Sequence, residues 1–311
     1  MPPHSTSSSS SGHAFSRRVA PFAPLALALL MQSAVLGPPA GEGSPEGEAR
    51  TLQVARCDDV EDFRDCHTRY PTGCTLSATG DYDTYLNLLK NQIRFPASPS
   101  PVMFLSSKEE FQDLDQQVLN LPQKLTSRNH VKLKEALDGM GEHQLRGTVG
   151  FLYSVKVEKG GSGETSNCKL KDDEEEVDFH LGIGFDPDLA ARLRAAVASH
   201  KKPTPSDRRE MRQNNIIVEM TPHYRFAFRP GWTADALTPL LGRQVKVVGQ
   251  LLADNEHNIR SQNCALPDAT EDCWRASLWE LHPVTQFQVC KSSNSCDLNS
   301  NDWEDLETLS P

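Results

Sequence analysis

The chain has 311 residues, 37% of them hydrophobic and 24% charged, a balance typical of a globular protein with one large or two small domains. Its formal net charge of −10 argues against a non-specific nucleic-acid binder and against docking on anionic lipid, because both need basic surfaces. The P-loop, the dinucleotide fingerprint and the G-x-S-x-G and H-E-x-x-H motifs do not occur, so the corresponding enzyme classes are not indicated.

Residues 1–40 have the pattern of a secretory signal peptide. A Ser-rich start ends in Arg17 and Arg18, an apolar run follows, and small residues between Ala34 and Gly43 offer cleavage points. The alternative is an uncleaved membrane anchor, but two prolines and a glutamine make the apolar run a poor spanning helix. We therefore expect an exported protein, periplasmic or extracellular, with no membrane span in its mature form.

All eight cysteines lie beyond this signal, and an even number in an exported chain predicts disulfide bonds. The C-x-x-C spacing of thioredoxin-like proteins, zinc ribbons and haem-attachment sites is missing. We expect Cys264 to pair with Cys273, and Cys290 with Cys296, because each pair closes a short loop. The other expected bonds are one between two of Cys57, Cys66 and Cys74, and one between the third of these and Cys168.

A flexible leader over residues 41–55 is expected to precede a small helical, disulfide-stapled region over residues 56–143. Three amphipathic helices are predicted in this region, over residues 81–93, from residue 107 onward and over residues 127–137. The second helix begins with a capping box formed by Ser107 and Glu110. The third is expected to stop at Gly139.

From residue 144 the pattern changes to that of strands. Five strands are predicted, over residues 143–159, 177–185, 216–220, 244–254 and 277–290, with a short helix over 232–242 between the third and fourth. This order is that of the OB-fold, a five-stranded, partly open barrel. The predicted fold class is therefore α+β, with an OB-like β-barrel over residues 144–291 that contains an inserted helix over 186–202. A small open sheet backed by helices is the alternative.

The sequence also predicts the local structure of three further segments. Residues 201–215 are predicted to form a loop, and the tail over residues 292–311 is predicted to be acidic and unpacked. Residues 221–231 are predicted to extend the third strand. In that extension, alternating aromatic residues would form either a stacking platform for bases or sugars or an ordinary half-buried strand; these residues are Tyr224, Phe226 and Phe228.

A resemblance to known proteins lies in four segments of the predicted barrel: VDFHLGIG, IIVEM, VKVVGQLLAD with a nearby His257, and SLWELHPVTQFQV. They resemble a group of exported bacterial proteins of uncharacterised function with a compact OB-like barrel. That group has an Asp-x-His strand, a Val-Glu strand, a Val-x-x-x-Gly strand and a closing Glu-Leu-His-Pro strand. The resemblance covers residues 144–290 and implies the fold and export, without an activity or a cofactor.

Polar side chains on the predicted strands and at their ends form the candidate ligand-binding site: Asp178, His180, Glu219, Asp254, His257, Glu280 and His282. Glu280 and His282 lie two residues apart in the last strand and therefore share a face, which we expect to be half-exposed. The opposite face of that strand is predicted to be core; it carries Trp279, Leu281, Pro283, Thr285, Phe287 and Val289.

These carboxylates and imidazoles allow three interpretations. They could form a divalent-metal site that activates water, or an acid–base pair, or simply hydrogen-bonded partners on half-exposed strands. We expect an exported binding or interaction module for a small molecule, a saccharide or a protein, with nucleic acid disfavoured by the acidic charge. The alternatives are a hydrolase that uses the His/carboxylate face and a structural cell-envelope protein. The sequence indicates no particular cofactor.

Overall fold

The computed structural model describes residues 81–91, 102–158, 166, 177–291 and 295–309. All described residues belong to one compact unit. The predicted signal peptide and leader lie outside the described residues, as do Cys57, Cys66, Cys74 and Cys168.

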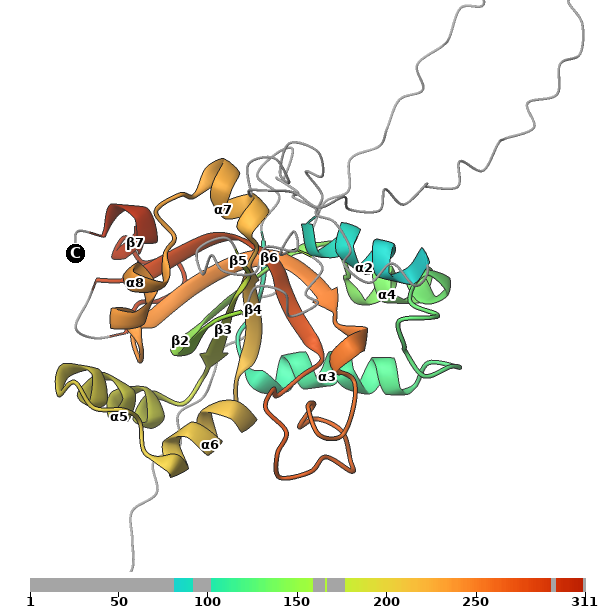
Figure 1. Ribbon diagram of the computed structural model, residues 1–311, viewed down its shortest axis with the longest axis horizontal. Coiled ribbons are helices and arrows are strands. Elements are labelled where there is room, and N and C mark those ends of the chain that lie inside the picture. The colour runs from blue at the N-terminus through green and yellow to red at the C-terminus, as the bar shows by residue number, and fades with distance from the viewer. Residues whose placement is uncertain (1–80, 92–101, 159–165, 167–176, 292–294, 310–311) are drawn as a thin grey trace, which may run out of the picture. The chain divides into compact units, whose positions relative to one another are not determined.

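Five strands close into a barrel (Figure 1): β2 (Leu145–Val157), β3 (Phe179–Gly184), β4 (Ile216–Met220), β5 (Gln244–Ala253) and β6 (Trp279–Cys290). Their order around the barrel is β2–β3–β4–β6–β5, and β5 pairs again with β2. All of these pairs are antiparallel except β4–β6, which is parallel and aligns Val218 with Leu281. The predicted α+β class with an OB-like barrel is confirmed.

The helix expected between the third and fourth barrel strands is present as α8 (Ala234–Leu237) and the 3-10 turn η3 (Thr238–Leu240). The side chain of Thr233 caps α8 by accepting a hydrogen bond from the backbone N–H of Ala236. Gly242 then takes a left-handed conformation with φ of 78°, which leads the chain into β5.

The expected strand extension over residues 221–231 is wrong, because α7 (Pro222–Phe228) occupies it. Pro222 at the first helical position favours a helix start, and the alternating aromatics do not share a strand face. Tyr224 is buried, whereas Phe226 and Phe228 are 41% and 47% exposed, so the expected stacking platform does not form.

Two helices connect β3 to β4. The predicted α5 (Pro187–Ala198) is confirmed, but the loop expected over residues 201–215 is wrong, because α6 (Pro205–Gln213) occupies most of it. A capping box between Thr204 and Asp207 starts α6, with Pro205 at its first turn.

The N-terminal helices are α2 (Asp81–Asn91), α3 (Lys108–Leu119) and, after the 3-10 turn η1 (Val131–Leu133), α4 (Lys134–Met140). Ser107 caps α3 as predicted, whereas α4 ends at Gly141 in a left-handed conformation and not at Gly139. A short strand, β1 (Met103–Leu105), pairs in parallel with β2. Apolar side chains of α3 and α4 belong to the same core as the barrel.

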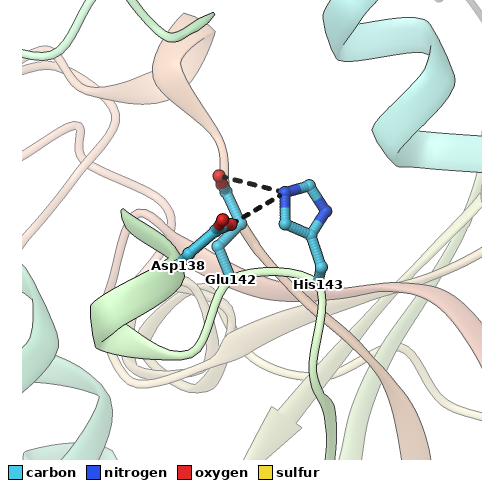
Figure 2. A group of neighbouring side chains, drawn as sticks. All are labelled: Asp138, Glu142 and His143. Carbon is cyan, nitrogen blue, oxygen red and sulfur yellow. Dashed lines mark ion pairs between the residues drawn. The ribbon is translucent and has the colours of Figure 1, made fainter. Parts of the chain in front are cut away.

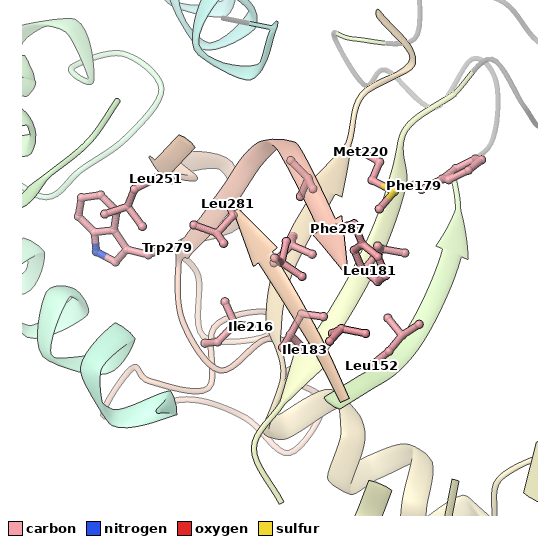
Figure 3. Packing of buried hydrophobic residues seen from close by; sticks show 14 of the residues in the cluster. Leu152, Phe179, Leu181, Ile183, Ile216, Met220, Leu251, Trp279, Leu281 and Phe287 are labelled. Atoms are coloured by element: carbon pink, nitrogen blue, oxygen red, sulfur yellow. The ribbon is translucent and has the colours of Figure 1, made fainter. Parts of the chain in front are cut away.

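The core fills the barrel with alternate side chains of each strand, several of which Figure 3 shows: Leu152, Phe179, Leu181, Ile183, Ile216, Met220, Leu281 and Phe287. The predicted core face of β6 is confirmed for Trp279, Leu281, Phe287 and Val289, all of which are buried in this cluster. Register shifts around Gly249 interrupt the alternation of β6, so Val284 joins this cluster as well. Pro283 and Thr285 are also buried, but they lie outside the cluster.

The expectation of an unpacked C-terminal tail is wrong. A last strand, β7 (Trp303–Asp305), pairs with β6, and Trp303 packs against the disulfide between Cys290 and Cys296. Its 3-10 continuation, η5 (Leu306–Thr308), buries Leu306 in the main core. The predicted Cys290–Cys296 pair is confirmed, as is the pair between Cys264 and Cys273 in the loop before β6.

Candidate functional site

The outer faces of three neighbouring strands bring the predicted polar residues together. On β3, β4 and β6 the side chains of the main core point into the barrel, so the polar residues that alternate with them lie on the opposite side. His180 aligns with Glu219 across β3 and β4, and Glu280 and His282 follow on β6. These strand faces therefore converge in the structure.

His282 lies at the centre of this group. Its Nδ1 atom is 2.9 Å from Oε2 of Glu219 and 3.0 Å from Oε1 of Glu280. A carboxylate oxygen of Asp178 lies within 4.8 Å of donor atoms of Glu219 and His282. Glu219, Asp178, Glu280 and His282 are all buried, so they form a charged layer beneath the surface.

His180 lies at the edge of the group and retains a small exposed surface. Its Nε2 atom is 3.2 Å from Oε1 of Glu219, and its Nδ1 atom is 3.3 Å from Oε1 of Glu158. Both ring nitrogens therefore face carboxylates, which favours the protonated imidazolium.

Arg275 joins the remaining predicted residues to this group. Its guanidinium donates hydrogen bonds of 2.8 Å to Asp254 and 2.7 Å to Glu280, and Asp254 also pairs with His257. Burial alone would lower the pKa of Arg275, but the charges of Glu280 and Asp254 outweigh it and raise that pKa. The seven predicted residues thus belong to one connected ionic network.

Sequence reasoning missed Arg275, and the only available signal was indirect. Several carboxylates predicted for one small region require a buried cation to compensate them. Arg275 is the cation in this structure, but in the sequence it stands within a cysteine-rich loop, where nothing marks it as buried.

The expectation that Glu280 and His282 are half-exposed is wrong, because neither side chain has any exposed surface. The N-terminal helix α3 covers this end of β6. Gln112 donates a hydrogen bond to the backbone carbonyl of Ala276, and Asp115 accepts one from the backbone N–H of Leu278. A ligand therefore cannot reach His282 directly.

A pocket of about 470 Å³ opens where the network meets the surface at His180. Its lining comes from β2, β3, β4, the end of α6 and the loop closed by the Cys264–Cys273 bond: Ser154, Lys156, His180, Arg212, Asn215, Ile217, Asp272 and Trp274. The volume lies in the range of small-molecule sites. Of the predicted residues, His180 is the one that lines this pocket.

Comparisons with protein-family models, curated proteins and solved structures found no match for this chain. The barrel agrees with the fold that the sequence resemblance implies. In the part of the chain that the structure describes, no helix is long and apolar enough to cross a membrane.

Proposed function

We propose that this protein is an exported binding module and that its ligand is a saccharide held in the pocket beside His180. One observation carries the proposal. The pocket lies on the outer face of the second and third barrel strands, β3 and β4, next to the loop between the fourth and fifth, β5 and β6. OB-folds bind oligosaccharides and oligonucleotides on this surface.

The chemistry of the lining favours a hydroxyl-rich ligand. Lys156 and Arg212 offer donors, Asp272 offers acceptors, and Asn215 offers both, which matches sugar hydroxyls that donate and accept at once. Trp274 supplies an amphipathic aromatic surface for the flat side of a sugar ring. The net charge of −10 disfavours the polyanionic alternative, an oligonucleotide.

The hydrolase alternative is less well supported by the geometry. A general base needs a ring nitrogen that is free to take a proton from water. Both nitrogens of His180 face carboxylates, and His282 is fully buried, so neither imidazole combines a free nitrogen with access to the pocket.

Export is supported by the signal-like N-terminus and by the two disulfide bonds, because such bonds persist in oxidising compartments. The resemblance of the barrel strands to exported bacterial proteins supports the same compartment. Mass spectrometry of the secreted protein from its native host would test this, and an intact N-terminus retained in the cytoplasm would contradict it.

The tryptophans provide a direct test of binding. Trp232, Trp279 and Trp303 are buried, so a ligand in the pocket acts chiefly on the partly exposed Trp274. We expect a saturable change in intrinsic fluorescence with at least one of three hexasaccharide probes: a glucan, a chitin oligomer and a uronic-acid oligomer.

Trp274→Ala and Asn215→Ala should abolish this binding, whereas Phe228→Ala, which alters an exposed aromatic residue outside the pocket lining, should not. A single-stranded oligonucleotide is the competing probe. Binding of the oligonucleotide in preference to all three saccharides, or binding that survives Trp274→Ala, would overturn the proposal.

A further inference from the structure

A second group of metal-type ligands lies outside the pocket, at the turn between α4 and β2 (Figure 2). Asp138 stands in the last turn of α4, Gly141 turns the chain with φ of 103°, and Glu142 and His143 follow. His143 itself has φ of 65°, and its backbone N–H donates to the carbonyl of Leu251. This turn brings two carboxylates and an imidazole to one point.

Three oxygens surround a single nitrogen at this point. Nε2 of His143 lies 3.2 Å from Oδ1 of Asp138, 3.8 Å from Oε2 of Glu142 and 3.5 Å from the hydroxyl of Tyr85. One N–H group cannot serve three acceptors, and a charge-assisted hydrogen bond would be shorter, about 2.7–2.9 Å. Among the described residues, the buried Oδ1 atom of Asp138 has no hydrogen-bond partner.

These separations suit ligands arranged around an ion. Metal–ligand bonds of about 2.0–2.2 Å at tetrahedral or octahedral angles place neighbouring donor atoms about 3.0–3.5 Å apart. The distance from His143 to Asp138 falls within this range, and the distance from His143 to Glu142 exceeds it by only a few tenths of an ångström.

The surrounding residues hold both carboxylates in place. Oε1 of Glu142 accepts a hydrogen bond of 3.0 Å from the backbone N–H of Ala253 and lies 2.9 Å from Nε2 of His130. Oδ2 of Asp138 pairs with Lys134. Nε2 of His130 also lies 3.1 Å from Oε2 of Glu142, so the imidazole of His130 holds both oxygens of this carboxylate. Both carboxylates are thus positioned by neighbouring side chains while one oxygen of each faces His143, and metal ligands are typically supported in this way.

We propose that Asp138, Glu142 and His143 bind a divalent transition-metal ion, with Zn²⁺ as the preferred ion. One imidazole nitrogen and two carboxylate oxygens suit Zn²⁺, whereas Mg²⁺ and Ca²⁺ prefer oxygen ligands alone. The Asp138 side chain is 39% exposed, so an ion can enter from solvent and water can complete its coordination. This site shares no residue with the proposed saccharide pocket and does not depend on it.

The test is calorimetric titration of Zn²⁺ into the full chain after treatment with EDTA and dialysis. We expect one saturable site that equimolar Mg²⁺ does not block, together with a rise in Tm on addition of Zn²⁺. Asp138→Asn and His143→Asn should each weaken the Kd at least tenfold. Asparagine is chosen for His143 because it tolerates positive φ, so the substitution removes the ligand without new backbone strain.

Glu135→Gln is the matched control, because it removes one exposed carboxylate from the same helix outside the ligand group. Its Kd for Zn²⁺ should equal that of the wild type. No saturable binding and no rise in Tm would show that the group is an ion pair only. Wild-type affinity in both ligand variants would show that Zn²⁺ binds at another site. Each of these two results would overturn the proposal.

Discussion

Nδ1 of His282 lies 2.9 Å from a carboxylate oxygen of Glu219, and solvent reaches at most 1% of either side chain. Burial alone would lower the pKa of His282, but the charge of Glu219 and hydrogen bonds with Glu219 and Glu280 outweigh it and raise the pKa to about 10. Burial opposes ionisation of Glu219 too, yet His180 and His282 hold its pKa well below the usual value. The two side chains therefore form an ion pair at neutral pH.

The stability of the protein should fall as the pH becomes alkaline. The unfolded chain releases the His282 proton near its ordinary pKa of 6.5, whereas the folded chain keeps it to about 10. The folded state binds more protons between these values, so the ion pair stabilises fully below pH 6.5 and is lost as the pH rises towards 10. Urea unfolding at pH 6, 8 and 10 measures this loss. In the His282→Gln variant the free energy of unfolding should depend less on pH. If the free energy of unfolding of the wild type is constant between pH 6 and 10, His282 does not have the raised pKa.

Removing the buried cation of the network should be costly. Arg275→Met removes the guanidinium that pairs with both Asp254 and Glu280 and leaves these buried carboxylates only the imidazoles of His257 and His282. We therefore expect a loss of about 3–5 kcal/mol in the free energy of unfolding. Arg229→Met is the control, because its pair with Glu307 is partly exposed and should contribute at most about 1 kcal/mol. Equal losses in the two variants would show that the Arg275 pairs are no more important than surface pairs.

Asp115 should produce a pH dependence of the same sign in a more acidic window. Burial raises the pKa of Asp115 from 3.8 to about 6, although hydrogen bonds such as that from the backbone N–H of Leu278 oppose the shift. The folded state therefore binds more protons between pH 4 and 6, and stability from this group falls by roughly 3 kcal/mol as the pH rises through that range. Asp115→Asn should remove this fall and be more stable than the wild type at pH 7. Thermal unfolding of both proteins at pH 4, 5, 6 and 7 tests this prediction. If Tm changes with pH in parallel for the wild type and the variant, the pKa of Asp115 is not raised.

The two described disulfide bonds should contribute similarly to stability but differ in their effect on the pocket. Loops closed over sequence separations of 9 and 6 residues should each contribute about 2–3 kcal/mol by restricting the unfolded chain. Replacing Cys264 and Cys273 by serine frees the loop that carries Asp272 and Trp274, so acrylamide should quench fluorescence more strongly. Replacing Cys290 and Cys296 by serine should leave quenching unchanged, and the reverse pattern would refute this role for the loop.

The sequence predicts the local features of this fold well. Alternation fixes which side chains of β3 and β6 face the core near Leu181 and Leu281, and short spacing predicts the pairing of Cys264 with Cys273. The convergence of the strand faces that carry His180 and His282 also follows from alternation once the barrel order is known.

The burial of the polar network could not be predicted in the same way. It depends on contacts between distant segments, such as the hydrogen bond from the backbone N–H of Leu278 to Asp115, which is 163 residues away in the chain. Arg275 is missed for the same reason, because its two carboxylate partners meet it only in the folded state. The loop predicted where α6 lies is a different kind of error, since Thr204 and Asp207 did carry a capping signal.

The segment that contains α5 and α6 contributes side chains to the pocket, but neither helix contributes to the main core of the barrel. The two helices pack with Tyr153 and Phe151 of β2 in a small cluster of their own, apart from the main core. Arg212 and Asn215, at the end of this connection, line the pocket. Exchanging this helical pair for another should therefore change the lining of the pocket and leave the side chains of the main core as they are.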